Sequence, residues 1–226
     1  MKIGVVIPVL SQYKLAVDLI AHLRSAYTLE TFIIPQYRHQ LPLSGAWNYG
    51  MNEAFRKDCN YVLVMNDDVL LSPWAIDEMV EEIGPGQYQG LAVVTATNAR
   101  GHLNPDDVLT LEKPSLEDMC APPSGPDFAC FMMTKMTYDA VGPFDENFTP
   151  AYFEDNDYHR RVNLLGMRAE GKRSAIMYHY GSQTQNAISN KPVVPPPQFV
   201  KNRQYYVSKW GGEPGKETYN TPFNKE

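Results

Sequence analysis

The chain contains little of what several common protein classes require. It has three cysteines in 226 residues, and none of them form the close Cys-x-x-Cys pairs of structural metal sites. So sparse and odd a count argues against a disulfide scaffold and suits a reducing compartment. No apolar run approaches the roughly 18 residues that a membrane-spanning helix needs. The formal net charge of −6 argues against a broad basic surface, although a local basic groove stays possible.

The first apolar run, Ile3–Val9, resembles a strand more than a signal peptide. It is short, contains Pro8, and is not followed by a cleavage site of small residues. We therefore expect a soluble protein of the cytoplasm, or of the host cytoplasm if the source is a phage or virus. The length favours one domain, because domains usually have about 100–200 residues.

Strand-like and helix-like patterns alternate along the first half of the chain. Strands are expected at 2–9, 29–34, 61–65, 91–96, 127–134 and 175–179. Helices are expected at 13–26, 44–58, 72–83, 154–165 and 199–210. Ser72 and Pro73 are typical of a helix start, as N-cap and first helical residue. The alternation predicts an α/β fold with a mostly parallel central sheet flanked by helices.

The second half is less regular. Residues 98–126 are rich in proline, aspartate and glycine, and a loop of this length in a compact domain is often functional. Residues 192–198 are rich in proline and predict an extended linker. We therefore expect a catalytic domain over residues 1–190, followed by a short C-terminal extension, 191–226, whose helix packs near the bound ligand.

Asn66, Asp67 and Asp68 directly follow the buried strand predicted at 61–65. Ligands of open α/β sheets bind outside the carboxyl ends of the strands. Mg²⁺ and similar cations are often held by one or two carboxylates together with substrate phosphates. The segment therefore predicts a metal held against a diphosphate. The alternative is a plain acidic turn, because Asn and Asp also favour turns.

A second acidic cluster, Glu154, Asp155 and Asp157, opens the helix predicted at 154–165. Acidic residues in a first turn are favoured by the helix dipole, which is the simpler explanation. Pairing of Asp157 with Arg161, four residues on, would leave Asp155 to act as a general base. His179 ends another predicted strand, where it is either a metal ligand beside a carboxylate or an ordinary polar residue.

Read together, these segments resemble the family 2 glycosyltransferases of the GT-A fold, most closely their rhamnosyltransferase-like members. The likeness covers about residues 2–212 and rests on motifs in a fixed order. These are the first strand ending at Pro8, the Gly-x-x-Asn-x-Gly pattern 45–50, the Asp-x-Asp-like triplet 66–68, the Gly-x-Phe-Asp-Glu-x-Phe turn 142–148, the Glu-Asp-x-Asp helix start 154–157, and His179.

The resemblance implies a Rossmann-like GT-A fold and a role for each matching residue. Asp155 would be the catalytic base, and Asp68 with His179 would bind Mn²⁺ or Mg²⁺. Contacts to a nucleoside-diphosphate sugar, the donor, are expected from Pro8, Gly45, Asn48, Asn66 and Asp67.

Three further donor contacts are expected where the chain departs from the family or extends beyond it. Relatives place an Asp after the second strand to contact uracil, whereas residues 34–39 contain none, so Gln36 or Arg38 would contact the base. In the tail, Lys209 could close over the diphosphate, and Trp210 could stack on a sugar or base. The alternative for Lys209 is a solvated basic helix.

The implied activity is metal-dependent, inverting transfer of a hexosyl or deoxyhexosyl group to an acceptor hydroxyl. The acceptor would be a glycan, a lipid-linked glycan or another hydroxyl-bearing molecule, and a modified nucleic acid base is an alternative. A second alternative is a module that binds nucleotide-sugar without catalysis. A sugar-nucleotidyltransferase fits less well, because it would need a glycine-rich basic loop after the first strand, where residues 8–12 read Pro-Val-Leu-Ser-Gln.

Overall fold

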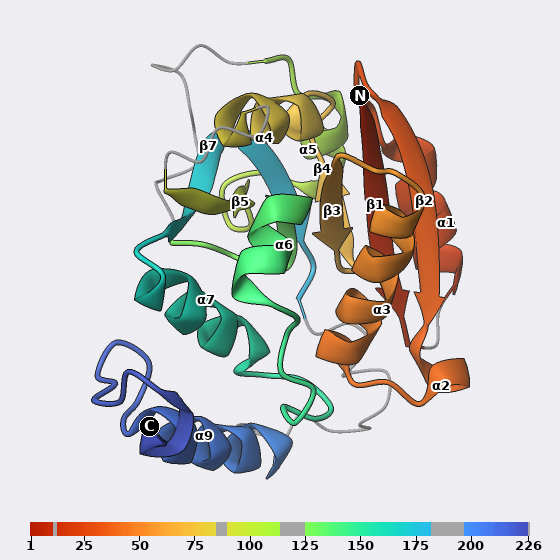
Figure 1. The fold of residues 1–226 in the computed structure, drawn as a ribbon. Coiled ribbons are helices and arrows are strands. Elements are labelled where there is room, and N and C mark those ends of the chain that lie inside the picture. The colour runs from red at the N-terminus through yellow and green to blue at the C-terminus, as the bar shows by residue number, and fades with distance from the viewer. Residues whose placement is uncertain (11–12, 85–89, 114–124, 182–196, 226) are drawn as a thin grey trace.

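The computed structural model describes residues 1–10, 13–84, 90–113, 125–181 and 197–225. They form an α/β fold built on one seven-stranded sheet of order β2-β1-β3-β6-β5-β7-β4 (Figure 1). The strands are β1 Lys2–Val9, β2 Thr28–Pro35, β3 Tyr61–Met65, β4 Val69–Leu71, β5 Leu91–Asn98, β6 Cys130–Thr134 and β7 Arg168–His179. The helices are α1 Tyr13–His22, α2 Gln36–His39, α3 Leu43–Arg56, α4 Ala75–Ile83, α5 Pro105–Thr110, α6 Lys135–Val141, α7 Glu154–Leu164, α9 Pro197–Trp210 and the 3₁₀ helix η2 Pro222–Asn224.

Strand direction decides which residues meet at the edge of the sheet. Strands β1, β2, β3, β5 and β7 run one way, while β6 pairs antiparallel with both β3 and β5, and β4 pairs antiparallel with β7. An antiparallel strand begins where its neighbour ends. The beginnings of β4 and β6 therefore lie at the same edge as the ends of β3, β5 and β7.

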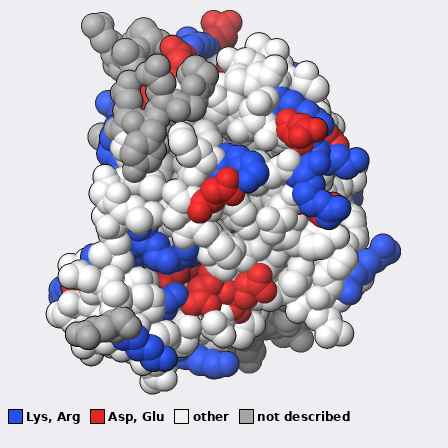
Figure 2. All heavy atoms as spheres, in the orientation of Figure 1, with Lys and Arg blue, Asp and Glu red and all other residues white. Residues whose placement is uncertain are grey.

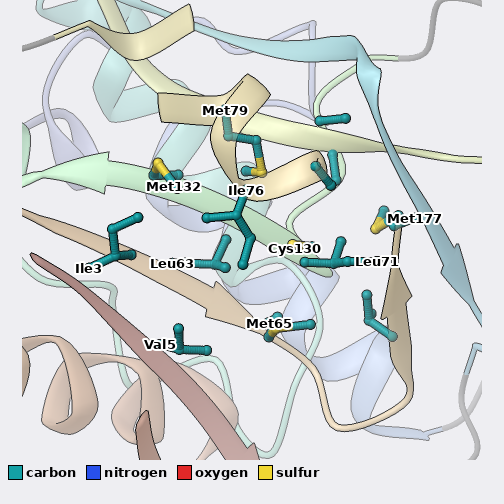
Figure 3. Packing of buried hydrophobic residues seen from close by; sticks show 14 of the residues in the cluster. Ile3, Val5, Leu63, Met65, Leu71, Ile76, Met79, Cys130, Met132 and Met177 are labelled. Atoms are coloured by element: carbon teal, nitrogen blue, oxygen red, sulfur yellow. The ribbon is translucent and has the colours of Figure 1, made fainter. Parts of the chain in front are cut away.

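Apolar side chains cover both faces of the sheet. On one face, the sheet packs against α1 and α4, and Figure 3 shows Ile76 and Met79 of α4 above Ile3, Leu63 and other strand residues. On the other face, α3, α6 and α7 pack over residues such as Val64. Burial on both faces explains why β1 and β3 are continuous apolar runs rather than alternating ones.

Helix α3 lies unusually close to the sheet because glycines stand at the contacts. A Cβ atom on Gly50 of α3 would lie 2.2 Å from Cγ1 of Val6, and one on Gly4 of β1 would lie 2.5 Å from the Cβ of Ala54. Neither position tolerates a side chain without displacing the helix. The close contact holds the start of α3 beside the carboxyl end of β1.

The predicted α/β class is confirmed, and the strands and helices predicted at 2–9, 61–65, 154–165 and 199–210 agree with the structure to within two residues. Four predictions were wrong in detail. The helix predicted at 13–26 ends at His22, and the strand predicted at 175–179 already begins at Arg168. Ser72 does not cap α4, because that helix begins three residues later with Trp74 at its N-cap. The strand predicted from residue 127 begins at Cys130, because the N–H of Ala129 turns back to Asp127.

The C-terminal extension contains α9, which lies against the α7 side of the molecule (Figure 1). The linker predicted at 192–198 falls outside the described residues except for Pro197 and Gln198, which already belong to α9. Among the residues that the structure describes, we find no helix with the length and apolar character of a membrane span.

Candidate active site

The candidate site lies at the edge where β3, β5 and β7 end and where β4 and β6 begin. Residues 66–68 connect β3 to β4, and Asp127 precedes β6. The backbone N–H of Asn66 donates to the carbonyl of Ala129 at 2.9 Å, which ties these two connections together. The segment 66–68 and the residues before β6, about 60 positions apart in the sequence, therefore lie side by side at this edge.

Asp68 and His179 meet at this edge, as the resemblance implied. The Nε2 atom of His179 lies 3.2 Å from Oδ1 of Asp68. His179 is the last residue of β7 and pairs with Val69, the residue that follows Asp68. Burial lowers the pKa of His179, but the negative charges of Asp68 and Asp127 outweigh it and leave the pKa above its ordinary value. Asp68 itself is buried. An imidazole nitrogen and a carboxylate oxygen thus converge on one point.

Asp127 is a site residue that sequence reasoning missed. It accepts a hydrogen bond from the N–H of Ala129 at 3.0 Å, and its own N–H donates to the Thr95 hydroxyl at 3.1 Å. Its charge raises the pKa of both His179 and Asp155. No motif marked this residue, because it lies at the end of an irregular stretch and only the antiparallel course of β6 brings it to this edge.

Asp155 and Glu154 begin α7 and face the same region. Burial raises the pKa of Asp155 above its ordinary value, and the charge of Asp127 adds to the effect. Burial and the neighbouring Asp155 raise the pKa of Glu154 to about 8. The Oε2 atom of Glu154 has no hydrogen-bond partner among the described residues. A carboxylate with a raised pKa is a better proton acceptor than an ordinary aspartate, which suits a general base.

Arg100 adds a positive charge close to His179. Its N–H donates to Oδ1 of Asn98 at 3.0 Å, and that oxygen also lies 3.4 Å from the N–H of His179. The Arg100 guanidinium packs against Gly181, where a Cβ atom would lie only 2.5 Å from its Nη1 atom. Its charge lowers the pKa of His179. Sequence reasoning missed Arg100, since an arginine in a loop carries no pattern of its own.

Pro8, Gln36 and Arg38 lie at the other end of the same sheet edge, where β1 and β2 end. Pro8 and Gln36 are buried, whereas Arg38 is exposed. The Nε atom of Arg38 donates to the Tyr37 hydroxyl at 3.1 Å, and the Tyr37 ring meets Tyr13 edge to face at 6.3 Å between centroids. Of the three predicted base and strand-end residues, Arg38 is the one with an exposed side chain, and it lies beside the aromatic pair.

Gly45 and Asn48, expected at the donor, have packing roles in the structure. The amide of Asn48 donates to the carbonyl of Phe144 and to Glu146, both at 2.9 Å, and accepts from the N–H of Phe144 at 2.8 Å. A Cβ on Gly45 would lie 3.0 Å from Pro42 and 3.2 Å from Glu146. These residues join α3 to the turn 142–148, so the amide of Asn48 is already committed within the protein.

Lys209 and Trp210, also expected at the donor, are both buried between α9 and α7. The Lys209 ammonium lies 2.6 Å from Asp145 and 2.6 Å from Asp157, and the Trp210 indole N–H donates to Asp157 at 2.8 Å. Arg161 pairs with the other oxygen of Asp157 at 3.0 Å, as predicted. We call these five residues the anchor network. They hold α9 on α7.

The side chains at the site supply only some of the ligands that a divalent cation needs. Asp68 and His179 would supply one oxygen and one nitrogen ligand, a pair that suits Mn²⁺ better than Mg²⁺. Within the described ranges, no three His, Cys, Asp or Glu side chains are grouped closely enough to hold a metal by themselves. The remaining positions would be filled by water or by the oxygens of a bound diphosphate, as is common for magnesium and its analogues.

One curated protein resembles the chain at the sequence level. It is a galactofuranosyl glycosyltransferase of Leishmania donovani, 24% identical, and the likeness covers 76% of this chain. The match spans 47% of the relative, so this chain corresponds to about half of that protein. No protein-family model matches the chain.

Solved structures give a broader likeness. The catalytic domain of Drosophila beta1,4-galactosyltransferase 7 complexed with xylobiose has a TM-score of 0.54 at 9% identity, covering 89% of this chain and 79% of the fly protein. GalNAc-T7 with UDP, GalNAc and Mn²⁺ has a TM-score of 0.59 at 11% identity, covering 93% of this chain and 49% of that one. These likenesses, together with the mixed sheet and its flanking helices, show that the chain has the GT-A glycosyltransferase fold.

Proposed function

We propose that the protein is a metal-dependent inverting glycosyltransferase that uses a nucleoside-diphosphate sugar. The observation that carries the proposal is the convergence of Asp68, His179 and Asp155 at one edge of a GT-A sheet. The neighbours support it, because GalNAc-T7 was solved with UDP, GalNAc and Mn²⁺, and a mutant of the fly enzyme with manganese, UDP-Gal and xylobiose.

Asp68 and His179 would hold the cation, with the neutral imidazole and the carboxylate as ligands. When bound, the metal would act as a Lewis acid that stabilises the charge developing on the leaving diphosphate. Arg100 lies beside His179 and would add positive charge on the same side. Arg38, with Tyr37 and Tyr13, would meet the base at the far end of the edge.

Asp155 would act as the general base. Its carboxylate takes the proton from the acceptor hydroxyl while that oxygen bonds to the anomeric carbon and the bond from this carbon to the diphosphate breaks. Attack from the face opposite the leaving group inverts the configuration. General-base catalysis of this kind contributes about 10²–10⁴ in rate. The raised pKa of Asp155 favours the proton transfer.

For the acceptor, we propose a glycan or another hydroxyl-bearing molecule, and for the sugar a hexosyl or deoxyhexosyl group. The rhamnosyltransferase-like motifs in residues 142–157 support a deoxyhexose. The relative found by sequence, in contrast, is named for galactofuranose. The face drawn in Figure 2 alternates basic and acidic side chains and carries no wide basic field. This pattern does not favour nucleic acid as the acceptor.

The proposal is tested first by calorimetry with UDP, GDP, dTDP, ADP and CDP, each with and without Mn²⁺. We expect one of them to bind with metal-dependent affinity, which would also identify the base that contacts Arg38. Absence of binding to all five in the presence of Mn²⁺ would contradict the proposed donor site.

A second assay separates an enzyme from a module that only binds. The nucleoside-diphosphate sugar chosen by the binding panel is incubated with the protein and Mn²⁺, and release of the diphosphate is followed with and without a mixture of acceptor glycans. Acceptor-stimulated release is expected of a transferase. Tight binding without any release would favour the non-catalytic module instead.

A further inference from the structure

The backbone directly before Asp155 is held in an uncommon conformation. Tyr152 has φ of 85° and Phe153 has φ of 73°, two successive non-glycine residues in the left-handed region. Phe153 is also the N-cap residue of α7, where its side chain makes no capping hydrogen bond. Such residues cost of order 1–3 kcal/mol each and persist only when the surrounding structure holds them.

Helix α9 supplies the groups that hold this segment. The side-chain amide of Asn202 donates to the carbonyl of Ala151 at 2.8 Å and to the carbonyl of Tyr152 at 3.1 Å. Asn202 is only 1% exposed. The ring of Phe199 lies 5.4 Å from that of Tyr152 and 5.0 Å from that of Phe153, measured between centroids. One helix turn of α9 thus contacts every residue from 151 to 153.

The same helix also holds the residues that follow Asp155. Lys209 and Trp210 bind Oδ1 of Asp157 at 2.6 Å and 2.8 Å. Asp157 has no exposed surface. Asp155 therefore stands between two points that α9 fixes, the peptide carbonyls before it and the buried carboxylate two residues after it.

We infer that α9 is a positioning element for the catalytic base and that Asn202 is its main positioning residue. By holding the carbonyls of residues 151 and 152, Asn202 sets the backbone from which the carboxylate of Asp155 reaches the acceptor hydroxyl. The inference rests on the proposed role of Asp155. It gives the C-terminal extension a function in turnover that differs from the donor contact expected of Lys209 and Trp210.

The test compares Asn202→Ala and Asn202→Asp with wild-type protein. Both remove the two N–H donors, and the second keeps the shape of the side chain. We expect kcat to fall about 10- to 100-fold, because a displacement of about 1 Å at a reacting group can cost 10²-fold. The donor Kd should stay within about twofold, since the hydrogen bonds of Asn202 go to the carbonyls of residues 151 and 152 and not to the proposed metal ligands.

Two matched controls lie on the same helix. Arg203→Ala breaks an exposed ion pair with Glu213, and Tyr206→Phe removes the hydroxyl contact with Glu217 at 2.5 Å. Both loosen contacts between α9 and the chain that follows it while leaving residues 151–153 untouched. Each control should keep kcat within about twofold of wild type.

The pH profile of kcat separates positioning from plain destabilisation. Burial is the main cause of the raised pKa of Asp155. The charge of Asp127 raises this pKa further and that of His159 lowers it, and Asp155 in turn raises the pKa of the neighbouring Glu154. A looser segment exposes Asp155 to water, so the acidic limb of kcat should move to lower pH in the Asn202 variants. Loss of folded protein alone would lower the plateau without moving that limb.

Each outcome decides the inference. Folded Asn202 variants with wild-type kcat would overturn it, and so would equal losses in Tyr206→Phe. If both Asn202 variants fail to fold, Phe199→Leu replaces them, since it weakens the ring contacts with Tyr152 and Phe153, and an unchanged kcat there has the same meaning. Failure of the proposed function looks different, because wild-type protein would then neither transfer nor hydrolyse any donor.

Discussion

The first turn of α7 carries two aspartates in opposite surroundings. Asp155 faces the site edge, where its neighbours Glu154 and Asp127 are also acidic and its pKa is raised. Asp157, two residues on, faces the anchor network, where Lys209, Arg161 and Trp210 surround its carboxylate. The chemistry of the side chain is the same in both positions. What it faces decides whether it can exchange a proton or serves to fix a helix.

The largest expected effect is on kcat, and it tests the role of Asp155 in this comparison. Asp155→Asn removes the proposed base and should lower kcat by about 10²–10⁴, while the donor Kd stays unchanged. Stopped-flow or steady-state release of diphosphate measures it. Wild-type turnover in this variant would remove Asp155 from the mechanism.

The matching change in the anchor network should cost stability instead. Asp157→Ala leaves the buried ammonium of Lys209 with one partner fewer and should lower the free energy of unfolding by about 3–5 kcal/mol. Denaturant unfolding gives the value. As control, Asp139→Ala breaks an exposed pair with Lys135 and should change it by about 1 kcal/mol or less. Similar losses in the two variants would contradict the anchor role.

Removal of a proposed metal ligand should weaken donor binding without unfolding the protein. We expect Asp68→Ala to weaken Mn²⁺-dependent binding of the nucleoside diphosphate by about 10- to 100-fold, at least as much as loss of an outer-shell partner costs. Calorimetry with and without Mn²⁺ measures this, with Asp139→Ala again as control. Unchanged metal-dependent binding would dismiss Asp68 as a ligand.

A pH titration of stability sharpens the comparison on the site side. Because Glu154 has a folded-state pKa of about 8, well above its value in the unfolded chain, the folded state holds the proton more tightly. Stability from this group is present at low pH and is lost as the pH rises towards 8. Glu154→Gln should remove this slope and be more stable than wild type near pH 8, by on the order of 1–3 kcal/mol. Parallel stability curves for the two proteins would contradict the raised pKa.

The smallest effect concerns Arg100. Its exposed charge is screened by solvent, so Arg100→Ala should weaken nucleoside-diphosphate binding roughly two- to fivefold, and less at high salt. Arg56→Ala, which breaks an exposed pair with Glu53, is the control and should leave binding unchanged. Equal affinities of Arg100→Ala and wild type at low salt would exclude a contact with the diphosphate.

Sequence patterns predicted the sheet and the pairing of Asp68 with His179 because both follow from local periodicity and strand ends. They did not predict β4, which is three residues long and lies within a turn-like segment. They also missed Asp127 and Arg100, since the loop between β5 and β6 carries no periodicity. The burial of Lys209 was not readable, because a lysine is almost always exposed unless a partner is present, and Asp145 comes from 64 residues away.

The antiparallel course of β6 has a consequence for how chains of this fold can vary in length. Strand β5 ends at Asn98 and its neighbour β6 begins at Cys130, with Thr95 paired to Phe131, so the intervening chain leaves and returns at one edge. Lengthening a connection of this kind costs little free energy, because closure entropy grows slowly with length. Insertions or deletions between these two strands therefore change the surface at this edge while the register of the sheet stays fixed.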